Sequence, residues 1–170
     1  MQRFAPWPVM LLVGLLCWQA AAADEPAPAY SATVIGPLNP LLTRGSQVLE
    51  AGRYEEGIRL TLAGLEQPNS TRDEAAAHSN VCAGYAALKR WTEALQHCNR
   101  ALDLDRSNWR TFNNRAAVFV GLKLFELAMT DVNAGLVLAP NSATLQKSRE
   151  VVIEHHNASD RERWRKLNKA

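Results

Sequence analysis

The sequence predicts an all-α fold of antiparallel helix-turn-helix repeats stacked side by side, ended by a C-terminal capping helix. Two observations carry this prediction. Aromatic residues recur at Tyr54, Trp91 and Phe125, and each is followed by a small side chain three residues later and by another ten residues later. The period is 37 residues between the first two copies and 34 between the last two. Such a period is the size of one helical hairpin in a repeat protein.

The first 23 residues have the plan of a secretory signal peptide. Arg3 supplies a positive charge, an apolar run covers 9–18, and small residues precede Asp24, so we expect cleavage after Ala23. The apolar run is about ten residues long, shorter than the ~20 that span a bilayer. We therefore expect an exported, periplasmic protein with no stable membrane insertion after cleavage.

Residues 24–37 form a proline-rich segment with few apolar side chains, which we expect to be a disordered linker. Removal of residues 1–23 leaves 18 of the 19 basic side chains and all 17 acidic ones. This near balance gives no electrostatic basis for binding nucleic acid.

Residues 38–142 divide into three units, 38–74, 75–108 and 109–142. The second helices read RYEEGIRLTLAGLEQ, RWTEALQHCNRALDL and LFELAMTDVNAGLVL. The first helices carry apolar or small residues at matching offsets: Val48, Tyr85 and Phe119, preceded by Gly45, Cys82 and Ala116. Short turns are expected at Ala51-Gly52, Lys89-Arg90 and Lys123-Leu124. The small residues allow the helix axes to approach closely.

These landmarks resemble the tetratricopeptide repeat (TPR) over Leu38 to Ser142. The third copy matches best, since Pro140 closes it as in the family pattern, whereas the second copy has Arg106 where proline is usual. The first copy departs most, with glycine or threonine at Gly57, Thr61 and Gly64. The resemblance implies a right-handed α-solenoid that binds protein or peptide partners and is not an enzyme.

Capping patterns predict where several helices begin. Thr71 and Glu74 form a capping box, so the next helix is expected to start near Arg72, one turn earlier than its counterpart. This accounts for the three extra residues between the first two copies. Asn108 and Ser142 are expected to cap the helices that follow them.

Residues 143–170 are expected to form the capping helix of the stack. Leu145, Val152, Ile153 and His156 share one helical face. Ser159 and Glu162 form a second capping box, which leaves two alternatives: a break near 157–159, or one continuous helix.

Two cysteines, Cys82 and Cys98, remain after removal of the signal segment. An even count in an oxidising compartment favours a disulfide, and a turn near Lys89 brings the two residues level. The bond would close a loop of about 15 residues, worth ~3 kcal/mol in the loop-entropy model. The alternative is that both are small core residues.

Other arrangements of reactive side chains do not predict catalysis or cofactor binding. His97 adjoins Cys98, but neighbours on a helix point about 100° apart, and His97 falls on the polar, solvent-facing side. His155 and His156 diverge in the same way and have poor partners for zinc. The sequence therefore predicts no catalytic residue, no metal site and no cofactor.

The resemblance implies that the first helix of each unit lines a concave groove that holds the partner. The residues mapped to this groove are Asn39, Leu42, Ser46, Leu49, Ala76, Ser79, Asn80, Ala83, Ala87, Arg110, Asn113, Asn114 and Ala117. One TPR subgroup clamps a C-terminal carboxylate with lysines and asparagines. Only Asn80 and Arg110 keep that pattern here, so the clamp is not carried over.

The sequence thus favours a periplasmic or cell-envelope adaptor that binds a protein or peptide through the groove. Two alternatives remain. One is a thiol-redox protein using Cys82 and Cys98, although their 16-residue separation differs from the CxxC spacing of redox-active pairs. The other is a structural accessory subunit of an envelope complex, or a homo-oligomer.

Overall fold

The computed structural model describes residue 33 and residues 39–167, and this part of the chain is all-helical. The signal segment and most of the linker lie outside the described residues. Seven helices follow one another: α1 (Pro40–Glu50), α2 (Tyr54–Leu65), α3 (Thr71–Ala87), α4 (Trp91–Leu104), α5 (Trp109–Gly121), α6 (Phe125–Leu138) and α7 (Ala143–Leu167).

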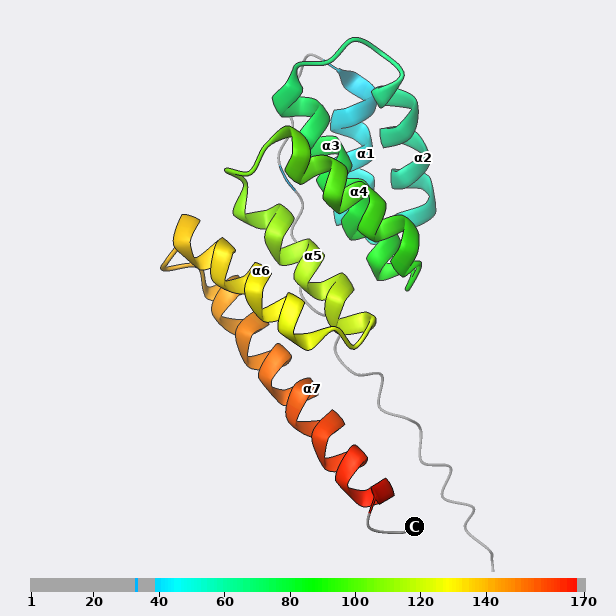
Figure 1. Cartoon of the computed structure of the whole chain (residues 1–170). Helices are drawn as coiled ribbons and strands as arrows, with labels where there is room; N and C mark the ends of the chain where they lie inside the picture. Colours follow the sequence, from blue (N-terminus) through cyan, green and yellow to red (C-terminus); the bar gives the residue numbers. More distant parts are fainter. Residues whose placement is uncertain (1–32, 34–38, 168–170) are drawn as a thin grey trace, which may run out of the picture.

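The helices form three antiparallel hairpins, α1–α2, α3–α4 and α5–α6, stacked in chain order (Figure 1). The first helices touch one another, α1 with α3 and α3 with α5, while among the described residues the second helices α2, α4 and α6 make no such contacts with each other. A stack that is closer on one side curves toward that side. The inner face is therefore the one lined by α1, α3 and α5, the helices to which the resemblance assigns it.

Each hairpin turns on one residue with a left-handed backbone. These residues are Gly52 (φ 76°), Lys89 (φ 57°) and Lys123 (φ 60°). The N–H of the next residue bonds back to the preceding helix: Arg53 to Val48 O at 3.1 Å, Arg90 to Tyr85 O at 2.9 Å and Leu124 to Phe119 O at 2.8 Å. This bond closes a Schellman-type cap, which satisfies carbonyls that the helix end leaves unpaired. The three turns lie where the sequence placed them.

Side-chain caps fix several helix starts. Asn108 Oδ1 accepts from Arg110 N at 3.1 Å, and Ser142 Oγ accepts from Leu145 N at 3.4 Å, as expected. The start of α3 differs by one residue: Ser70, not Thr71, is the cap, and its Oγ accepts from Asp73 N at 3.1 Å. The early start is confirmed, since α3 has 17 residues and α5 has 13.

Small residues bring the two helices of each hairpin close together. A Cβ added at Gly57 would lie 2.5 Å from Leu49 Cγ, and one added at Gly64 would lie 2.6 Å from Leu42 Cδ2. In the second hairpin Ala94 is fully buried. The small positions of the repeat are thus the contact points of its helices.

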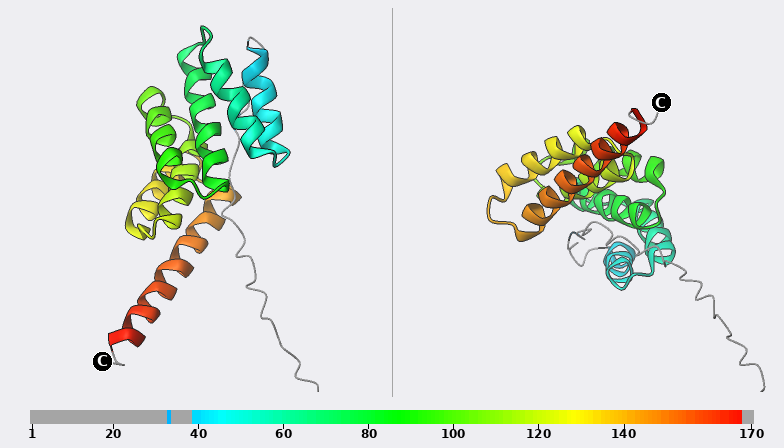
Figure 2. Two further views of the ribbon diagram at one scale, coloured as in Figure 1. Left: turned by 90° about the vertical axis from the view of Figure 1, so that its right-hand side faces the viewer. Right: turned by 90° about the horizontal axis from the view of Figure 1, so that it is seen from below.

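Helix α7 is continuous over 25 residues, so the second of the two alternatives is correct and Ser159 does not begin a new helix. In the first half of α7, Leu145 (0% exposed) and Val152 (2%) are buried, and the helix packs on α5 and α6. Its C-terminal end projects beyond the hairpins (Figure 2). None of the described helices combines the length and apolarity needed to cross a bilayer.

Candidate functional site

Most residues mapped to the groove lie at helix contacts on the inner side of the stack. Ala87 and Arg110 are half-buried. The buried ones are Asn39, Leu42, Ser46, Leu49, Ala76, Ser79, Asn80, Ala83, Asn113, Asn114 and Ala117. Partner binding by these residues stays a prediction.

Two of the groove asparagines join neighbouring inner helices. Asn114 Nδ2 on α5 donates to the carbonyl and to the hydroxyl oxygen of Ser79 on α3, both at 3.3 Å. Asn113 Oδ1 accepts from Ser148 Oγ on α7 at 2.6 Å. Buried amides need such partners, because an unpaired one costs about 1–3 kcal/mol. These contacts fix the spacing of the inner helices.

Asn80 has a different partner. Its carboxamide bonds to the backbone of Thr33, which lies 47 positions earlier in the chain. Thr33 is also contacted by Ser46 of α1 and by Asn108, the cap of α5. One residue from each hairpin therefore meets the same point of the N-terminal segment.

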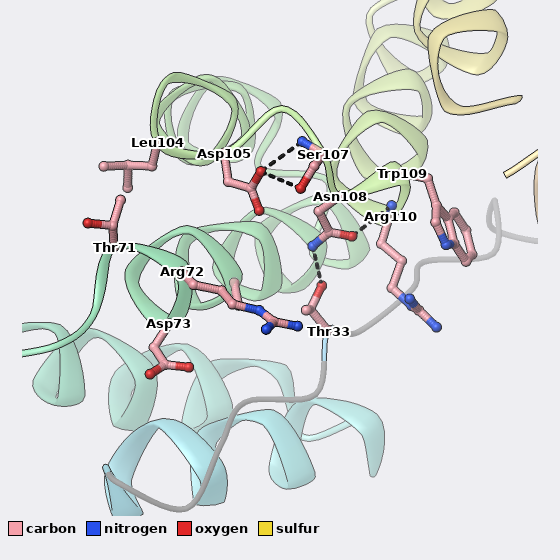
Figure 3. A pocket seen from close by; sticks show the side chains of 11 residues that line it. Thr33, Thr71, Arg72, Asp73, Leu104, Asp105, Ser107, Asn108, Trp109 and Arg110 are labelled. Carbon is pink, nitrogen blue, oxygen red and sulfur yellow. Dashed lines mark hydrogen bonds between the residues drawn. The ribbon is translucent and has the colours of Figure 1, made fainter. Parts of the chain in front are cut away.

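Beside Thr33 an open cavity of about 600 Å³ lies between the N-terminal ends of α3 and α5 (Figure 3). The first turn of α3 contributes Arg72 and Asp73, and the loop between α4 and α5 contributes Asp105. Arg110 lies over the Trp109 ring, 4.5 Å from its centroid. The pKa of Asp105 is lowered, chiefly because Ser107 donates hydrogen bonds to its carboxylate, and Arg72 adds to this effect. The cavity thus presents both signs of charge.

The sequence did not single out most of these cavity residues, since they belong to the junction between two units. The signal that was present is Arg106, which replaces the proline expected there. Ser107 N and Oγ both bond to Asp105 Oδ1 at 2.7 Å, so an Asp-Ser turn builds this junction instead.

Cys82 on α3 and Cys98 on α4 are at disulfide distance, with sulfurs 2.06 Å apart and Cα atoms 5.2 Å apart. Both residues are fully buried. They pack with Ala94 in the core of the second hairpin.

His97 does not point freely to solvent, which corrects the sequence prediction. It is half-buried, its Nδ1 lies 2.9 Å from Nδ1 of His78, and its ring centroid is 5.6 Å from that of Tyr85. Burial, followed by the nearby His78, lowers the pKa of His97 to about 4. The pKa of His78 is lowered mainly by burial as well. The polar edge of α4 faces α3 here, so its polar residues are partly covered.

The histidines of α7 do not assemble a metal site. His156 Nε2 lies 3.5 Å from Glu126 and 3.8 Å from Asp160, and its ring stacks on Phe125. No group of three or more potential metal ligands occurs within the described part of the chain.

Curated relatives match well over half of this chain. The chain is 26% identical over 136 residues to the peptidyl-prolyl cis-trans isomerase FKBP4 of Bos taurus, covering 73% of this chain and 29% of that protein. It is 27% identical over 105 residues to sperm-associated antigen 1 of Mus musculus, covering 62% and 11%. The chain therefore spans less than a third of the relatives' length. No protein-family model matches it.

Solved structures match the fold. The first TPR domain of human RPAP3 has a TM-score of 0.63 at 22% identity, covering 71% of this chain and 93% of that one. The first TPR of Spaghetti (RPAP3) bound to the HSP90 peptide SRMEEVD has a TM-score of 0.61 at 24% identity, covering 68% and 91%. A TPR-like protein of Chlorobium tepidum has a TM-score of 0.60 at 17% identity, covering 71% and 92%. Residues 39–167 thus have the fold of a TPR solenoid, three helical hairpins followed by a long final helix.

Proposed function

We propose that this chain is a non-catalytic adaptor of the periplasm or cell envelope that binds a protein or peptide partner through the inner face of its solenoid. The observation that carries the proposal is the open cavity where α3 and α5 begin, on that face. The Spaghetti TPR, which shares the fold, is bound to a peptide. A cavity with cations and carboxylates suits a polar peptide, whose charged side chains and backbone groups find partners there.

The cation on the α5 side of the cavity gives the test its target. Arg110 is held over Trp109, 4.5 Å from the ring centroid, so its guanidinium is positioned before a partner arrives. Asn80 is buried on the adjacent helix α3. Replacing both residues removes one charge and one amide from the proposed face.

The experiment compares partner capture by the double variant Asn80→Ala/Arg110→Ala with capture by the native protein, from an extract of the source cell's envelope. The matched control is Arg53→Ala/Lys147→Ala, which removes two exposed cations outside the cavity. Reduced capture by the first variant alone, with unchanged helicity by circular dichroism, is expected. If both variants capture as much partner as the native protein, the binding site does not lie on the inner face.

Export and the disulfide are proposed together. The segment before Asp24 has signal-peptide features, and an oxidising compartment is where a Cys82–Cys98 bond persists. Fractionation with N-terminal sequencing of the recovered protein is expected to find a periplasmic chain that begins at Asp24. A thiol count under denaturing, non-reducing conditions is expected to give none; two free thiols would exclude the bond.

The complete burial of both cysteines weighs against the thiol-redox alternative. A redox substrate must reach a sulfur, and Cys82 and Cys98 are both 0% exposed. The native protein is therefore expected to be inactive in an insulin-reduction assay.

Exposed apolar side chains on α6 and α7 favour a second candidate, an accessory subunit or homo-oligomer. Val137 is 81% exposed and Ile153 46% exposed, and where such side chains form one contiguous apolar patch they mark a site of chain association. Light scattering after gel filtration measures the assembly directly. A monomer at micromolar concentration that forms no envelope complex would exclude this candidate.

A further inference from the structure

Thr33 sits on the inner face as a bound peptide residue would. Its N–H donates to Asn80 Oδ1 at 2.7 Å, and its carbonyl oxygen accepts from Asn80 Nδ2 at 2.9 Å. A side-chain amide has one acceptor and one donor edge, and here both are used by the backbone of one residue. With Thr33 in place Asn80 is 1% exposed, so Thr33 supplies the hydrogen-bond partners that this buried amide requires.

The side chain of Thr33 is recognised as well as its backbone. Thr33 Oγ1 accepts from Asn108 Nδ2 at 2.9 Å (Figure 3). The other end of that amide caps α5, because Asn108 Oδ1 accepts from Arg110 N. The cap holds the Asn108 amide in place, so its donor points at a fixed position beside Asn80. A hydroxyl at that position gains a bond that an apolar side chain does not.

The contacts to Thr33 come from all three hairpins. Ser46 on α1 donates to the Thr33 carbonyl at a longer distance, 3.5 Å, Asn80 lies on α3, and Asn108 precedes α5. Thr33 also forms part of the wall of the 600 Å³ cavity. The residue therefore occupies the inner face at the point where a partner's chain would pass into the cavity.

We propose that Asn80 and Asn108 form a subsite for one threonine or serine of an extended peptide, and that Thr33 occupies this subsite in cis, so that a partner must displace it. The inference rests on the proposed function in that the same face binds the partner. It adds two features to that function: the subsite accepts a residue with a hydroxyl group, and a residue of the same chain competes for it. Because the competitor belongs to the same chain, its effective concentration is high, and a peptide that also binds the neighbouring cavity displaces it more readily.

The first experiment measures amide hydrogen exchange at Thr33 by NMR in the mature chain, residues 24–170, without any partner. The Thr33 N–H is expected to exchange on the order of tenfold or more slowly than in the free peptide AYSATVIGP, the sequence of residues 29–37. Asn80→Ala removes the acceptor and should abolish this protection. Thr33→Val, the matched control, keeps both backbone bonds and should retain protection at residue 33. Exchange in the native chain at the free-peptide rate would overturn the inference.

The second experiment measures competition, using fluorescently labelled AYSATVIGP and anisotropy. Thr33→Pro deletes the N–H that Asn80 accepts, so the cis residue competes less, and the labelled peptide should bind roughly two- to tenfold more tightly than to the native chain. Adding Asn80→Ala to Thr33→Pro should reverse the gain. The peptide AYSAVVIGP, which lacks the hydroxyl, should bind Thr33→Pro roughly two- to tenfold more weakly. Equal affinity of the labelled peptide for the native chain and for Thr33→Pro would overturn the inference.

The two proposals fail in different ways. Loss of partner capture tests the adaptor function, whereas protection of the Thr33 amide is measured on the protein alone. A protected Thr33 with capture unaffected by Asn80→Ala/Arg110→Ala leaves the cis contact standing and removes the adaptor site. If the Thr33 amide is unprotected and capture is reduced, the adaptor site stands and the cis contact is excluded.

Discussion

The second and third hairpins hold equivalent helices together by different means. Cys82 and Cys98 lie 34 positions before Ala116 and Val132, and His97 lies 34 before Asp131. In the second hairpin the pair is two sulfurs at bonding distance, and the neighbouring histidine contacts His78. In the third hairpin Ala116 and Val132 share an apolar cluster, and Asp131 is paired with a cation.

The difference shows that the repeat limits the volume of the two side chains at this helix contact but does not determine their chemical type. The first hairpin gives a third solution, because Gly45 and Thr61 stand at the same two positions. A Cβ at Gly45 would press on the Thr61 hydroxyl and lie 2.9 Å from its backbone N. Each pair fills the narrow space between the helices, and each is open to a separate test of what it contributes to stability.

The largest effect is expected at the buried ion pair of the third hairpin. Arg115 Nε and Nη2 bond to the Asp131 carboxylate at 2.7 and 2.8 Å, and the Asp131 side chain is 5% exposed. Arg115→Ala leaves this carboxylate buried without its counter-charge, so the free energy of unfolding should fall by about 3–5 kcal/mol. Urea denaturation followed by circular dichroism measures the loss.

The matched control is Arg53→Ala, which removes a surface partner of Glu56 and should cost under about 1 kcal/mol. Combining Arg115→Ala with Asp131→Ala should recover part of the loss, because no buried charge then remains. Equal losses for Arg115→Ala and Arg53→Ala would show that the pair is not stabilising.

The next effect is expected in the second hairpin when its two cysteines are replaced by the equivalent residues of the third. The variant Cys82→Ala/Cys98→Val copies the Ala116–Val132 pairing. The proposed bond spans a separation of 16, and its removal should lower the free energy of unfolding by about 3 kcal/mol. Denaturation of the native protein with and without a reductant provides the control. A variant as stable as the oxidised native protein would leave packing as the pair's entire contribution.

A smaller loss is expected in the first hairpin for Gly45→Ala, which copies the third hairpin at one position only. The new Cβ meets Thr61 side chain and backbone together, so α1 and α2 must move apart, at about 1–3 kcal/mol. Gln47→Ala, an exposed change on the same helix, should be close to neutral. A Gly45→Ala protein more stable than the native protein would mean that α1 and α2 leave room for the added Cβ, contrary to the structure.

The smallest effect is a pH dependence from the His78–His97 contact. Folding lowers both pKa values, that of His97 to about 4, so the unfolded chain binds more protons between pH 6.5 and 4. The contribution of the two neutral histidines to the free energy of unfolding is therefore fully present above about pH 6.5 and is lost as the pH drops toward 4. Glu74 and Arg100 act on His78 in opposite directions. The double variant His78→Gln/His97→Gln should lose less melting temperature between pH 7 and pH 5 than the native protein; an unchanged difference would contradict the assignment.

Local pattern predicted the hairpins well. Turns, caps and small contact positions follow from the order of residues within one unit, so Gly57, Ala94 and Asn108 were found from their spacing. Long-range pairing was predicted only where a hairpin makes it local, as for Cys82 and Cys98. The His78–His97 contact depends on which polar edge of α4 meets α3, and helical spacing alone does not fix that.

The inner face was the hardest part to predict. Asn80 fits the repeat pattern whether it is structural or binds a ligand, and its partner Thr33 stands 47 positions away in a segment with no periodicity. The residues around Thr33 give no sequence signal of the contact, because its bonds to Asn80 use backbone atoms that every residue has.

The extra turn of α3 has a consequence for where this repeat protein departs from regularity. The residues that lengthen the first interval from 34 to 37 include Arg72 and Asp73, which form one wall of the cavity. An insertion that looks like a loss of register in the sequence thus supplies one wall of the cavity on the inner face. A version of this chain with an even 34-residue period would lack that wall.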